Sequence, residues 1–494
     1  MFTKDNAHKI IKWKIIELET QFDVDKWVVN GIFIWSYVRI KLYFLLLKNY
    51  DLEINYDKKD SHHIEKTNNK WILNLKTLFN IIVAFFRTEL FFLGLKRKKI
   101  VFFGAHFHRV KHESYYFNRF FDSMVSYHQL ENEVYMMEYK KVYQHNYNQK
   151  AIIPLESLLK DFKLSVKFKN KFKKQKKDYS LLNYDSFLSV LENEIENFET
   201  LNIATNDLVK WSIKIQDLST FFKRFFLMVK PDKVIFLGYY GLDDLYAAIY
   251  AANVLQIKTI DFQHGTQSDV HMVFSSWTKN PKEGFNLMPQ EYWSWDEKSK
   301  INIDNWTKNT SNVTAKVVGQ PYLQYWKQKN NNLDYQNKVI LYTLNLMPLR
   351  EMFNESIGKT INESQCLWEI RLHPRNEFSM DEIKIYLDSL NVDRCKYHVH
   401  DSKELSLPEI LSKTIIHITA FSGSLIEAKI MGIPSVIINI LGKEIYKDYI
   451  DNELVYFLDQ DNSTFNSDFS DIYTRINGKE FKIENNDIVN PVLI

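Results

Sequence analysis

The chain has 494 residues, 45% of them hydrophobic and 25% charged, which is an ordinary globular composition and enough chain for two or three domains. Its net charge of +3 is too small for overall charge to indicate nucleic-acid binding. Cys366 and Cys395 have no paired spacing, which argues against a disulfide framework or a zinc site.

Residues 1–95 are predicted to form an apolar helical extension. Residues 1–14 lack the continuous apolar core and cleavage site of a signal peptide, so a cytoplasmic location is expected. Residues 71–95 are predicted to form a helix with a wide apolar face, followed by the basic stretch 96–99. The largely apolar run between Lys76 and Arg87 is too short to span a bilayer. This pattern suits peripheral binding at the inner face of the cell membrane, and it suits packing on the adjacent domain at least as well.

Residues 96–326 are predicted to form a Rossmann-like domain, because short apolar strands alternate with helices. An insertion at 162–177 carries eight lysines interleaved with three phenylalanines. Such a run is either a solvated face or a contact with an anionic membrane leaflet, and no binding module supports nucleic acid as a partner. The expected strands are Ile100 to Gly104, Val134 to Tyr139, Lys233 to Gly238, Lys258 to Phe262, Glu291 to Asp296 and Ala315 to Val318.

No metal site is predicted. His106, His108 and His112 lie close together after the first strand, but no acidic or cysteine ligand is spaced with them. We expect them to contact an acceptor or to lie in a solvated loop. The Asp-x-Asp pairs at 23/25 and 459/461 do not follow strands of a nucleotide domain, so a metal-bridged diphosphate site is not supported either.

A second Rossmann-like domain is predicted over 338–460, after a polar linker at 327–337 and before a polar tail of weak helical character at 461–494. Between a strand and a helix, the chain reads Ser422-Gly423-Ser424, with Glu427 one turn later. This turn has two interpretations: a site for phosphate, with Glu427 on ribose, or an ordinary helix cap. The expected strands are Lys338 to Leu344, Trp368 to Leu372, His398 to Asp401, Thr414 to Ala420 and Ser435 to Asn439.

The strand Trp368 to Leu372 begins a second anion-binding element. It contains Arg371 and runs into His373-Pro374-Arg375, and proline cannot continue a central strand. His373 and Arg375 should therefore lie at the same carboxyl edge of the sheet as Ser422, where open α/β sheets bind ligands. Imidazole and guanidinium groups both bind phosphate. Together the two elements predict a nucleotide-phosphate site.

These residues also carry a resemblance. Arg371-Leu372-His373-Pro374, the serine-rich turn with Glu427, and Gly432-Ile433-Pro434 resemble the donor half of GT-B glycosyltransferases, and more narrowly the bacterial CMP-dependent sialyl-, Kdo- and nonulosonate transferases. The resemblance implies a donor site made of Arg371, His373, Pro374, Arg375, Ser422, Gly423, Ser424 and Glu427. It also implies two Rossmann-like doubly wound α/β domains facing across a cleft, and no cofactor beyond the CMP-sugar donor.

The catalytic base should lie at a strand end of the first domain. His264 follows a buried strand, and Gln263-His264-Gly265 resembles the His-Gly motif of CDP-glycerol polymerases of teichoic acid synthesis. Asp243 and Asp244 are the alternative, since an acidic motif serves as base in His-Pro sialyltransferases. Here that motif continues with leucine in place of glycine, and capping of the next helix explains the aspartates equally well.

The sequence thus predicts a glycosyltransferase that moves an acidic sugar from a CMP donor onto a glycan or lipid-linked acceptor of capsule or lipopolysaccharide. Three other functions stay open. They are a CDP-glycerol-type polyol phosphate transferase, a UDP-sugar transferase or epimerase, and a non-catalytic nucleotide- or lipid-binding scaffold.

Overall fold

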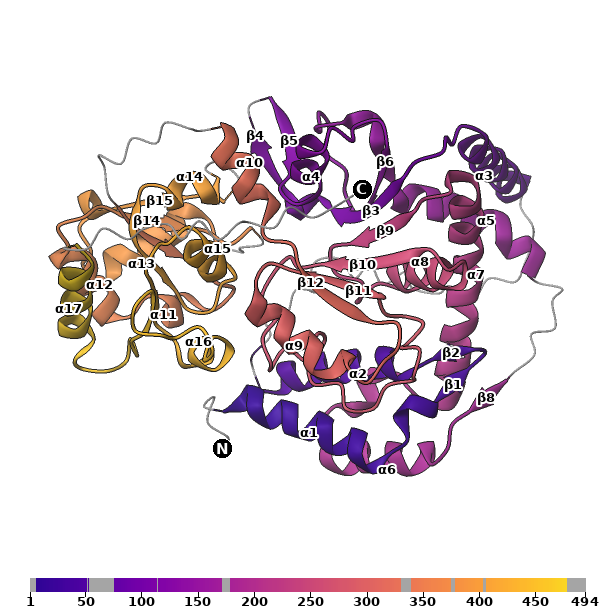
Figure 1. Cartoon of the computed structure of the whole chain (residues 1–494), viewed down its shortest axis with the longest axis horizontal. Coiled ribbons are helices and arrows are strands. Elements are labelled where there is room, and N and C mark those ends of the chain that lie inside the picture. Colours follow the sequence, from indigo (N-terminus) through magenta and orange to yellow (C-terminus); the bar gives the residue numbers. More distant parts are fainter. Residues whose placement is uncertain are drawn as a thin grey trace.

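The computed structural model of the chain describes residues 6–50, 52, 75–112, 114–170, 178–329, 339–374, 378–402 and 406–477, without the side chains of 75–78, 166–170, 327–329 and 477. Two α/β domains lie side by side, the C-terminal one on the left in Figure 1. This arrangement confirms the predicted fold class of two doubly wound α/β domains facing each other.

The first domain is built on a seven-stranded parallel sheet with the order β12-β11-β10-β9-β3-β6-β7. From β3 the chain adds β6 and β7 on one side and then β9 to β12 on the other, with all strands parallel. The boundary between β3 and β9 is therefore the topological switch point, where doubly wound sheets bind ligands. The strands are β3 (Ile100–Ala105), β6 (Val134–Tyr139), β7 (Ile152–Pro154), β9 (Lys233–Phe236), β10 (Lys258–Phe262), β11 (Glu291–Ser294) and β12 (Thr314–Val317).

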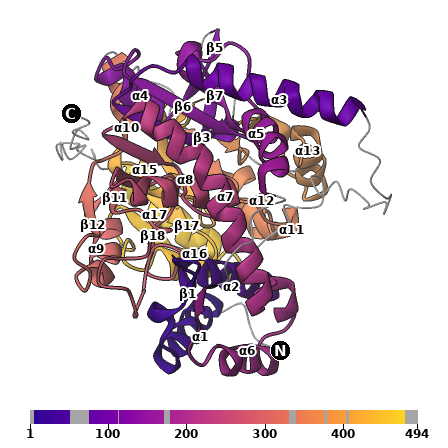
Figure 2. The same ribbon diagram turned by 90° about the vertical axis from the view of Figure 1, so that its right-hand side faces the viewer.

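Alternate residues of this sheet enter two different cores. Phe103 and Phe236 pack on the helices of one face, whereas Phe102 and Ile235 join a cluster that continues into the C-terminal domain. Figure 2 shows α7 running beside α5 along the sheet. The helices are α4 (Phe121–Tyr127), α5 (Leu155–Asn170), α6 (Tyr184–Glu194), α7 (Thr205–Val229), α8 (Asp243–Val254), α9 (Glu297–Thr307) and α10 (Pro321–Lys329).

The second domain has a six-stranded parallel sheet with the order β15-β14-β13-β16-β17-β18, reversing between β13 and β16. Its strands are β13 (Val339–Thr343), β14 (Trp368–Arg371), β15 (Tyr397–His400), β16 (Thr414–Thr419), β17 (Ser435–Ile437) and β18 (Val455–Phe457). Its helices are α11 (Leu349–Met352), α12 (Glu355–Glu363), α13 (Met380–Ser389), α14 (Leu407–Leu411), α15 (Ser424–Ile430), α16 (Ile440–Ile445) and α17 (Phe465–Asn477).

The segment expected to be a C-terminal tail is partly core. Helix α17 packs on α12, and its apolar side chains belong to the core of the second sheet, which corrects the polar tail expected from residue 461 onward. The buried residues are Phe465, Phe469, Ile472 and Ile476. Their helical spacing is what a packed helix requires. Residues 478–494 and the linker residues 330–338 lie outside the described residues.

The N-terminal helices also belong to the first domain rather than to a separate extension. Helices α1 (Ala7–Gln21) and α2 (Trp35–Asn49) share one hydrophobic cluster with the first sheet. Their anchor is the buried pair Glu19 and Arg39, joined by a 2.7 Å hydrogen bond. Arg39 also donates to the carbonyl oxygens of Ser275 and Ser276, which ties α2 to the loop after β10. The short strands here are β1 (Val28–Val29), β2 (Ile32–Phe33) and β8 (Tyr179–Ser180).

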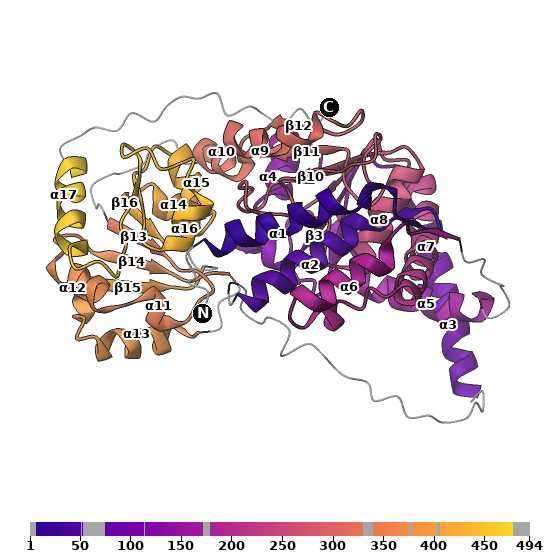
Figure 3. The same ribbon diagram turned by 90° about the horizontal axis from the view of Figure 1, so that it is seen from below.

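Helix α3 (Leu75–Leu93) presents bulky apolar residues to solvent. Ala84, Thr88 and Phe92 are buried against the domain, so the helix packs on the protein along a narrow strip that starts with two small residues. The rest of the helix surface exposes Phe79, Ile82, Phe85, Phe86, Leu90 and Leu93. In Figures 1 and 3, α3 lies at the far end of the molecule from α17. Among the described residues, no helix is both long and apolar enough to cross a bilayer.

Candidate functional site

The two predicted anion-binding elements lie at one edge of the second sheet. Strand β13 separates β14 from β16, and Thr343 at its end pairs with Arg371 on one side and Thr419 on the other. The segment beginning at His373 and the turn at Ser422 therefore leave the same carboxyl edge, one strand apart and at the switch point of the sheet. Arg375, also predicted here, lies outside the described residues.

Arg371 is a buried cation at this edge. Its Nη2 donates to the carbonyl oxygen of Ser402 at 2.8 Å, which fixes the guanidinium against the chain that follows β15. Burial and the neighbouring charge of Arg119 lower the pKa of Arg371 to about 10, and the carboxylates of Glu427 and Asp401 oppose that shift. The side chain is therefore still a cation at neutral pH.

Arg119 comes from the first domain, in the loop between β5 (Tyr115–Asn118) and α4, and the sequence reasoning missed it. Its guanidinium stacks over the ring of Phe120, with 4.8 Å between the guanidinium carbon and the ring centroid. Its Nε is buried, and no hydrogen-bond partner for it lies within the described part of the chain. Two like charges from different domains thus face the same place, and an anion bound there would relieve their repulsion.

Glu427 connects the two domains. Its Oε1 accepts a 2.9 Å hydrogen bond from Nε2 of Gln320, at the start of α10. Burial raises the pKa of Glu427, and the charges of Arg119 and Arg371 act in the opposite direction. The predicted role of Glu427 toward ribose stays a prediction. What its contacts establish is that this carboxylate lies among the two arginines at the domain junction.

The serine-rich turn uses its two hydroxyl groups differently. Ser424 Oγ lies 2.8 Å from Thr343 Oγ1 and 3.2 Å from His417 Nε2, so this buried hydroxyl is bonded within the sheet. The backbone N–H of Ser422 donates to Thr419 Oγ1 at 3.1 Å. Its own Oγ accepts a 3.3 Å hydrogen bond from the N–H of Ser424, and the residue is half-buried. Ser422 is therefore the better placed of the two to reach a ligand.

On the first domain, His264 lies over the carboxyl end of β9, close to the switch point. A Cβ atom at Gly238 would lie 3.1 Å from His264 Cε1, so glycine leaves room for the imidazole ring. The N–H of Gly238 donates to Asp261 Oδ1 at 3.0 Å, which holds that turn in place. The ring of His108 is also near, with 5.9 Å between the two ring centroids.

The loop that carries His264 lies close to the serine-rich turn. A Cβ atom added at Gly423 would lie 3.6 Å from Cα of Gly265, so there is room for about one methyl group between the two backbones. The Tyr446 hydroxyl lies 2.7 Å from Thr266 Oγ1 and donates to the carbonyl oxygen of Ser422 at 2.8 Å. The candidate base and the candidate phosphate turn are thus joined across the domain junction.

The alternative catalytic pair, Asp243 and Asp244, is bonded to helices. Asp243 accepts from Trp211 Nε1 at 2.9 Å and pairs with Lys214, both on α7. Asp244 pairs with Lys163 of α5 at 3.2 Å. Helix α8 begins at Asp243 itself, so neither carboxylate caps it, contrary to the capping alternative. These contacts connect α8 to its neighbours in the first domain.

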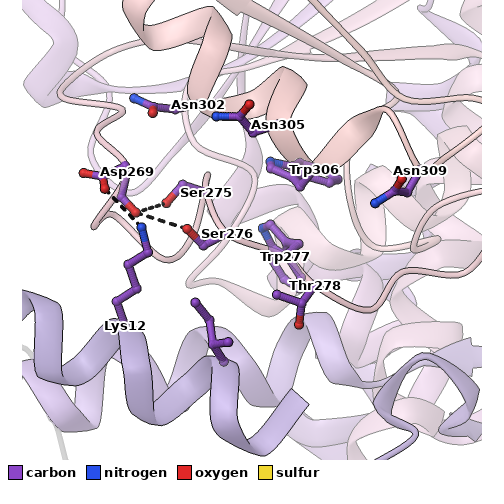
Figure 4. A pocket seen from close by; sticks show the side chains of 11 residues that line it. Lys12, Asp269, Ser275, Ser276, Trp277, Thr278, Asn302, Asn305, Trp306 and Asn309 are labelled. Atoms are coloured by element: carbon purple, nitrogen blue, oxygen red, sulfur yellow. Dashed lines mark hydrogen bonds and ion pairs between the residues drawn. The ribbon is translucent and has the colours of Figure 1, made fainter. Parts of the chain in front are cut away.

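A cavity of about 450 Å³ lies on the flank of the first domain, between α1 and α9 (Figure 4). The pair formed by Lys12 Nζ and Asp269 Oδ2, 3.0 Å apart, lies at one side of it. Trp277 and Trp306 line it but are almost fully buried, because they pack in the first hydrophobic cluster. None of the predicted site residues lines this cavity.

No family model matches the chain, and no curated protein matches it. Solved structures share its overall arrangement at low identity. UDP-GlcNAc 2-epimerase from Neisseria meningitidis is 15% identical with a TM-score of 0.44, covering 78% of this chain and 96% of that one. MurG from Acinetobacter baumannii is 10% identical with a TM-score of 0.39, covering 79% and 98%.

The wall teichoic acid polymerase TagF is 10% identical with a TM-score of 0.37, covering 83% of this chain and 93% of that one. At TM-scores below 0.5 and identities of 10–15%, these likenesses assign neither a family nor a reaction. The chain is therefore described by its own architecture, two doubly wound α/β domains joined at their strand ends.

Proposed function

We propose that this chain is a glycosyltransferase that uses a nucleotide-activated sugar. The observation that carries the proposal is the close approach of the His264 loop and the serine-rich turn, bridged by the Tyr446 hydroxyl, each at the carboxyl edge of a parallel sheet. Doubly wound sheets bind ligands at this edge. The donor nucleotide occupies the second domain and the acceptor the first, with the transferred sugar between them.

In the proposed reaction His264 takes the proton of an acceptor hydroxyl, and the hydroxyl oxygen forms a bond to the anomeric carbon. The bond between that carbon and the donor phosphate oxygen breaks, and the nucleotide leaves with the electron pair. Arg371 and Arg119 stabilise the charge that grows on the phosphate, because fixed cations in a water-poor site act on developing charge without reorganising. An imidazole titrates close to neutral pH, which suits a general base.

For the donor we propose a CMP-activated acidic sugar. Such a donor carries one phosphate and one sugar carboxylate, and two guanidinium groups from different domains face the junction. Arginine binds both kinds of anion bidentately. A CDP-linked polyol phosphate or a UDP-sugar carries a diphosphate instead, and a UDP-sugar is also the substrate of an epimerase with this architecture. These are the alternatives that the next experiment separates.

Thermal shift with CMP, UMP, CDP and UDP tests the donor class. A ligand present at a hundred times its Kd stabilises the folded protein by about 2.7 kcal/mol. We expect CMP to give the largest shift and Arg371→Ala to lose it. Arg394→Ala is the matched control, because Arg394 is an exposed arginine of the same domain that pairs with Asp388. Stabilisation by UDP alone would replace the CMP donor with a UDP-sugar.

Turnover of a panel of activated sugars with a lipid-linked acceptor extract, read by mass spectrometry, tests the reaction. His264→Ala should keep the nucleotide shift and lose turnover. His145→Asn is the matched control, since His145 is exposed and has a φ of 61°, a conformation that asparagine tolerates. Nucleotide binding without any product from the panel would favour the non-catalytic scaffold.

We also infer that the protein acts at the cytoplasmic leaflet of an anionic membrane, where a lipid-linked acceptor would be found. The exposed apolar residues of α3 at 79, 82, 85, 86, 90 and 93 fall within an arc of about 140° around the helix axis. Exposed basic residues, Arg87 and then Lys96 and Arg97, lie beside or just beyond this face. An apolar helical face bordered by cations suits the boundary between headgroups and acyl chains.

A further inference from the structure

The geometry points to a divalent metal site at the outer edge of the second sheet, formed by Glu369, His398 and His400. It is separate from the proposed reaction, and no step of that reaction passes through it. The ion expected from these three ligands is Zn²⁺.

The site follows from strand register. His398 and His400 are two residues apart on β15, so their side chains leave the same face of the sheet. Glu369 on β14 lies directly opposite His398, and its side chain belongs to that same face. The three side chains are therefore brought together by the backbone of two adjacent parallel strands.

The ligand atoms are already close enough to share an ion. One nitrogen of each imidazole and one carboxylate oxygen all lie within 4.8 Å of one another. His398 Nδ1 is 3.4 Å from Glu369 Oε1, and His400 Nε2 contacts Glu369 Oε2. Ligands about 2.1 Å from a tetrahedral ion are separated by roughly 3.4 Å, so small side-chain rotations complete the arrangement.

The donor types select the metal. Two imidazole nitrogens and one carboxylate are a set that Zn²⁺ accepts, whereas Mg²⁺ and Ca²⁺ prefer oxygen ligands throughout. The His398 side chain is 59% exposed, which leaves the ion open to water as its fourth ligand. The site therefore has three protein ligands and one exchangeable position.

A bound ion would hold β15 and β14 together at the edge of the second domain. β15 is the outermost strand of its sheet, and the chain after His400 leads to Ser402, whose carbonyl oxygen accepts from Arg371. Crosslinking β15 to β14 through the ion fixes the base of that segment. The alternative is a Glu369 carboxylate that only forms hydrogen bonds with the two histidines. A metal titration distinguishes this hydrogen-bonded cluster from a metal site.

The test is a titration of the full-length protein with Zn²⁺ and Co²⁺ after treatment with a chelator. We expect one equivalent of metal to bind, and the Co²⁺ form to show the intense visible absorption of a tetrahedral site. Zn²⁺ should raise the Tm, whereas Mg²⁺ should leave the Tm unchanged. His398→Ala is the safest variant because its side chain is exposed, and it should weaken binding by about tenfold or more. Glu369→Gln and His400→Ala should do the same, whereas His145→Asn should bind like the wild type.

Two results would overturn the proposal. One is the lack of any saturable binding to the wild-type chain, which leaves Glu369 and the histidines as a hydrogen-bonded cluster only. The other is one-equivalent binding that persists in the combined variant of all three residues, which places the ion elsewhere, for example at the exposed Cys395. Both readouts measure metal directly, so they stand whether or not the chain transfers a sugar.

Discussion

Thr266 of the first domain and Tyr446 of the second lie with their hydroxyl oxygens 2.7 Å apart, in the contact that joins the two candidate loops. The same Tyr446 hydroxyl reaches the carbonyl oxygen of Ser422. One phenol thus ties the loop after His264 to the turn proposed to hold phosphate. The spacing between base and leaving group then depends on this link.

Tyr446→Phe should therefore lower kcat while leaving the shift with nucleotide in place. We expect a fall in kcat of about tenfold, because small misplacements of reacting groups are costly, and a loss of about 1 to 2 kcal/mol in stability from the buried hydrogen bond. Tyr456→Phe is the control, since its hydroxyl donates to Glu453 within the second domain. Equal kcat in Tyr446→Phe and the wild type would show that the link is not needed for turnover.

The two serines of the turn should separate binding from folding. Ser424→Ala removes a hydroxyl that bonds Thr343 and His417 inside the sheet, so we expect a loss of about 1 to 3 kcal/mol in stability. Ser422→Ala should instead weaken nucleotide binding at nearly unchanged stability. Urea unfolding and nucleotide titration of both variants provide the measurement. A binding defect confined to Ser424→Ala would reverse these roles.

Asp243→Asn and Asp244→Asn should test whether either carboxylate is the base. Both aspartates pair with lysines of other helices at partly exposed positions, so each change should cost about 1 kcal/mol or less. We expect turnover within about twofold of the wild type, against the hundredfold or larger loss expected when a general base is removed. A large loss in Asp243→Asn at normal stability would move the base from His264 to this residue.

Much of the donor domain could be predicted from its sequence, because the signals there are local. Apolar runs such as Trp368 to Leu372 and Thr414 to Ala420 predicted strands that the structure contains, each ending one residue earlier than predicted. The pairing of β14 and β16 with β13 places both motifs at one edge, as parallel alternation implies. Which way a hydroxyl points, as for Ser424, depends on tertiary neighbours and has no local signal.

Other features of the molecule could be recognised only from the three-dimensional structure. Arg119 stands in no motif, and only the approach of the two domains brings it near Arg371. Helix α17 had a signal, since the buried apolar residues between Phe465 and Ile476 recur at helical spacing, but the surrounding polar residues obscured it. In α3 a wide apolar face was predicted, and the structure shows that this bulky face is the exposed one.

The proposed membrane role predicts that negative charges placed on the exposed apolar face of α3 prevent binding to anionic liposomes. Phe86→Glu with Leu90→Glu should abolish flotation with anionic liposomes, because each apolar side chain moved into the interface contributes about 1.5 to 3 kcal/mol. Stability should change little, since both residues are exposed. The control with the same charge change is Ile301→Glu with Ile385→Glu, which alters exposed isoleucines of α9 and α13. Flotation that survives in the α3 variant would exclude this face as the lipid contact.

Two buried histidines, His8 and His417, and the half-buried His271 predict that acid destabilises the fold. Burial lowers the pKa of His271 and of His417 to about 3 and that of His8 to about 4. The unfolded chain takes up protons on these groups below about pH 6.5 while the folded chain does not, so stability present above that pH falls as pH drops toward 3 or 4. Each histidine contributes a loss of up to about 1.4 kcal/mol per pH unit. Unfolding by urea at pH 7, 6 and 5 measures how steeply the free energy of unfolding falls with pH, and this slope gives the number of protons taken up on unfolding. His417→Gln should lower that number by about one, whatever the stability of the variant at pH 7. An unchanged slope in His417→Gln would mean that His417 is protonated in the folded protein.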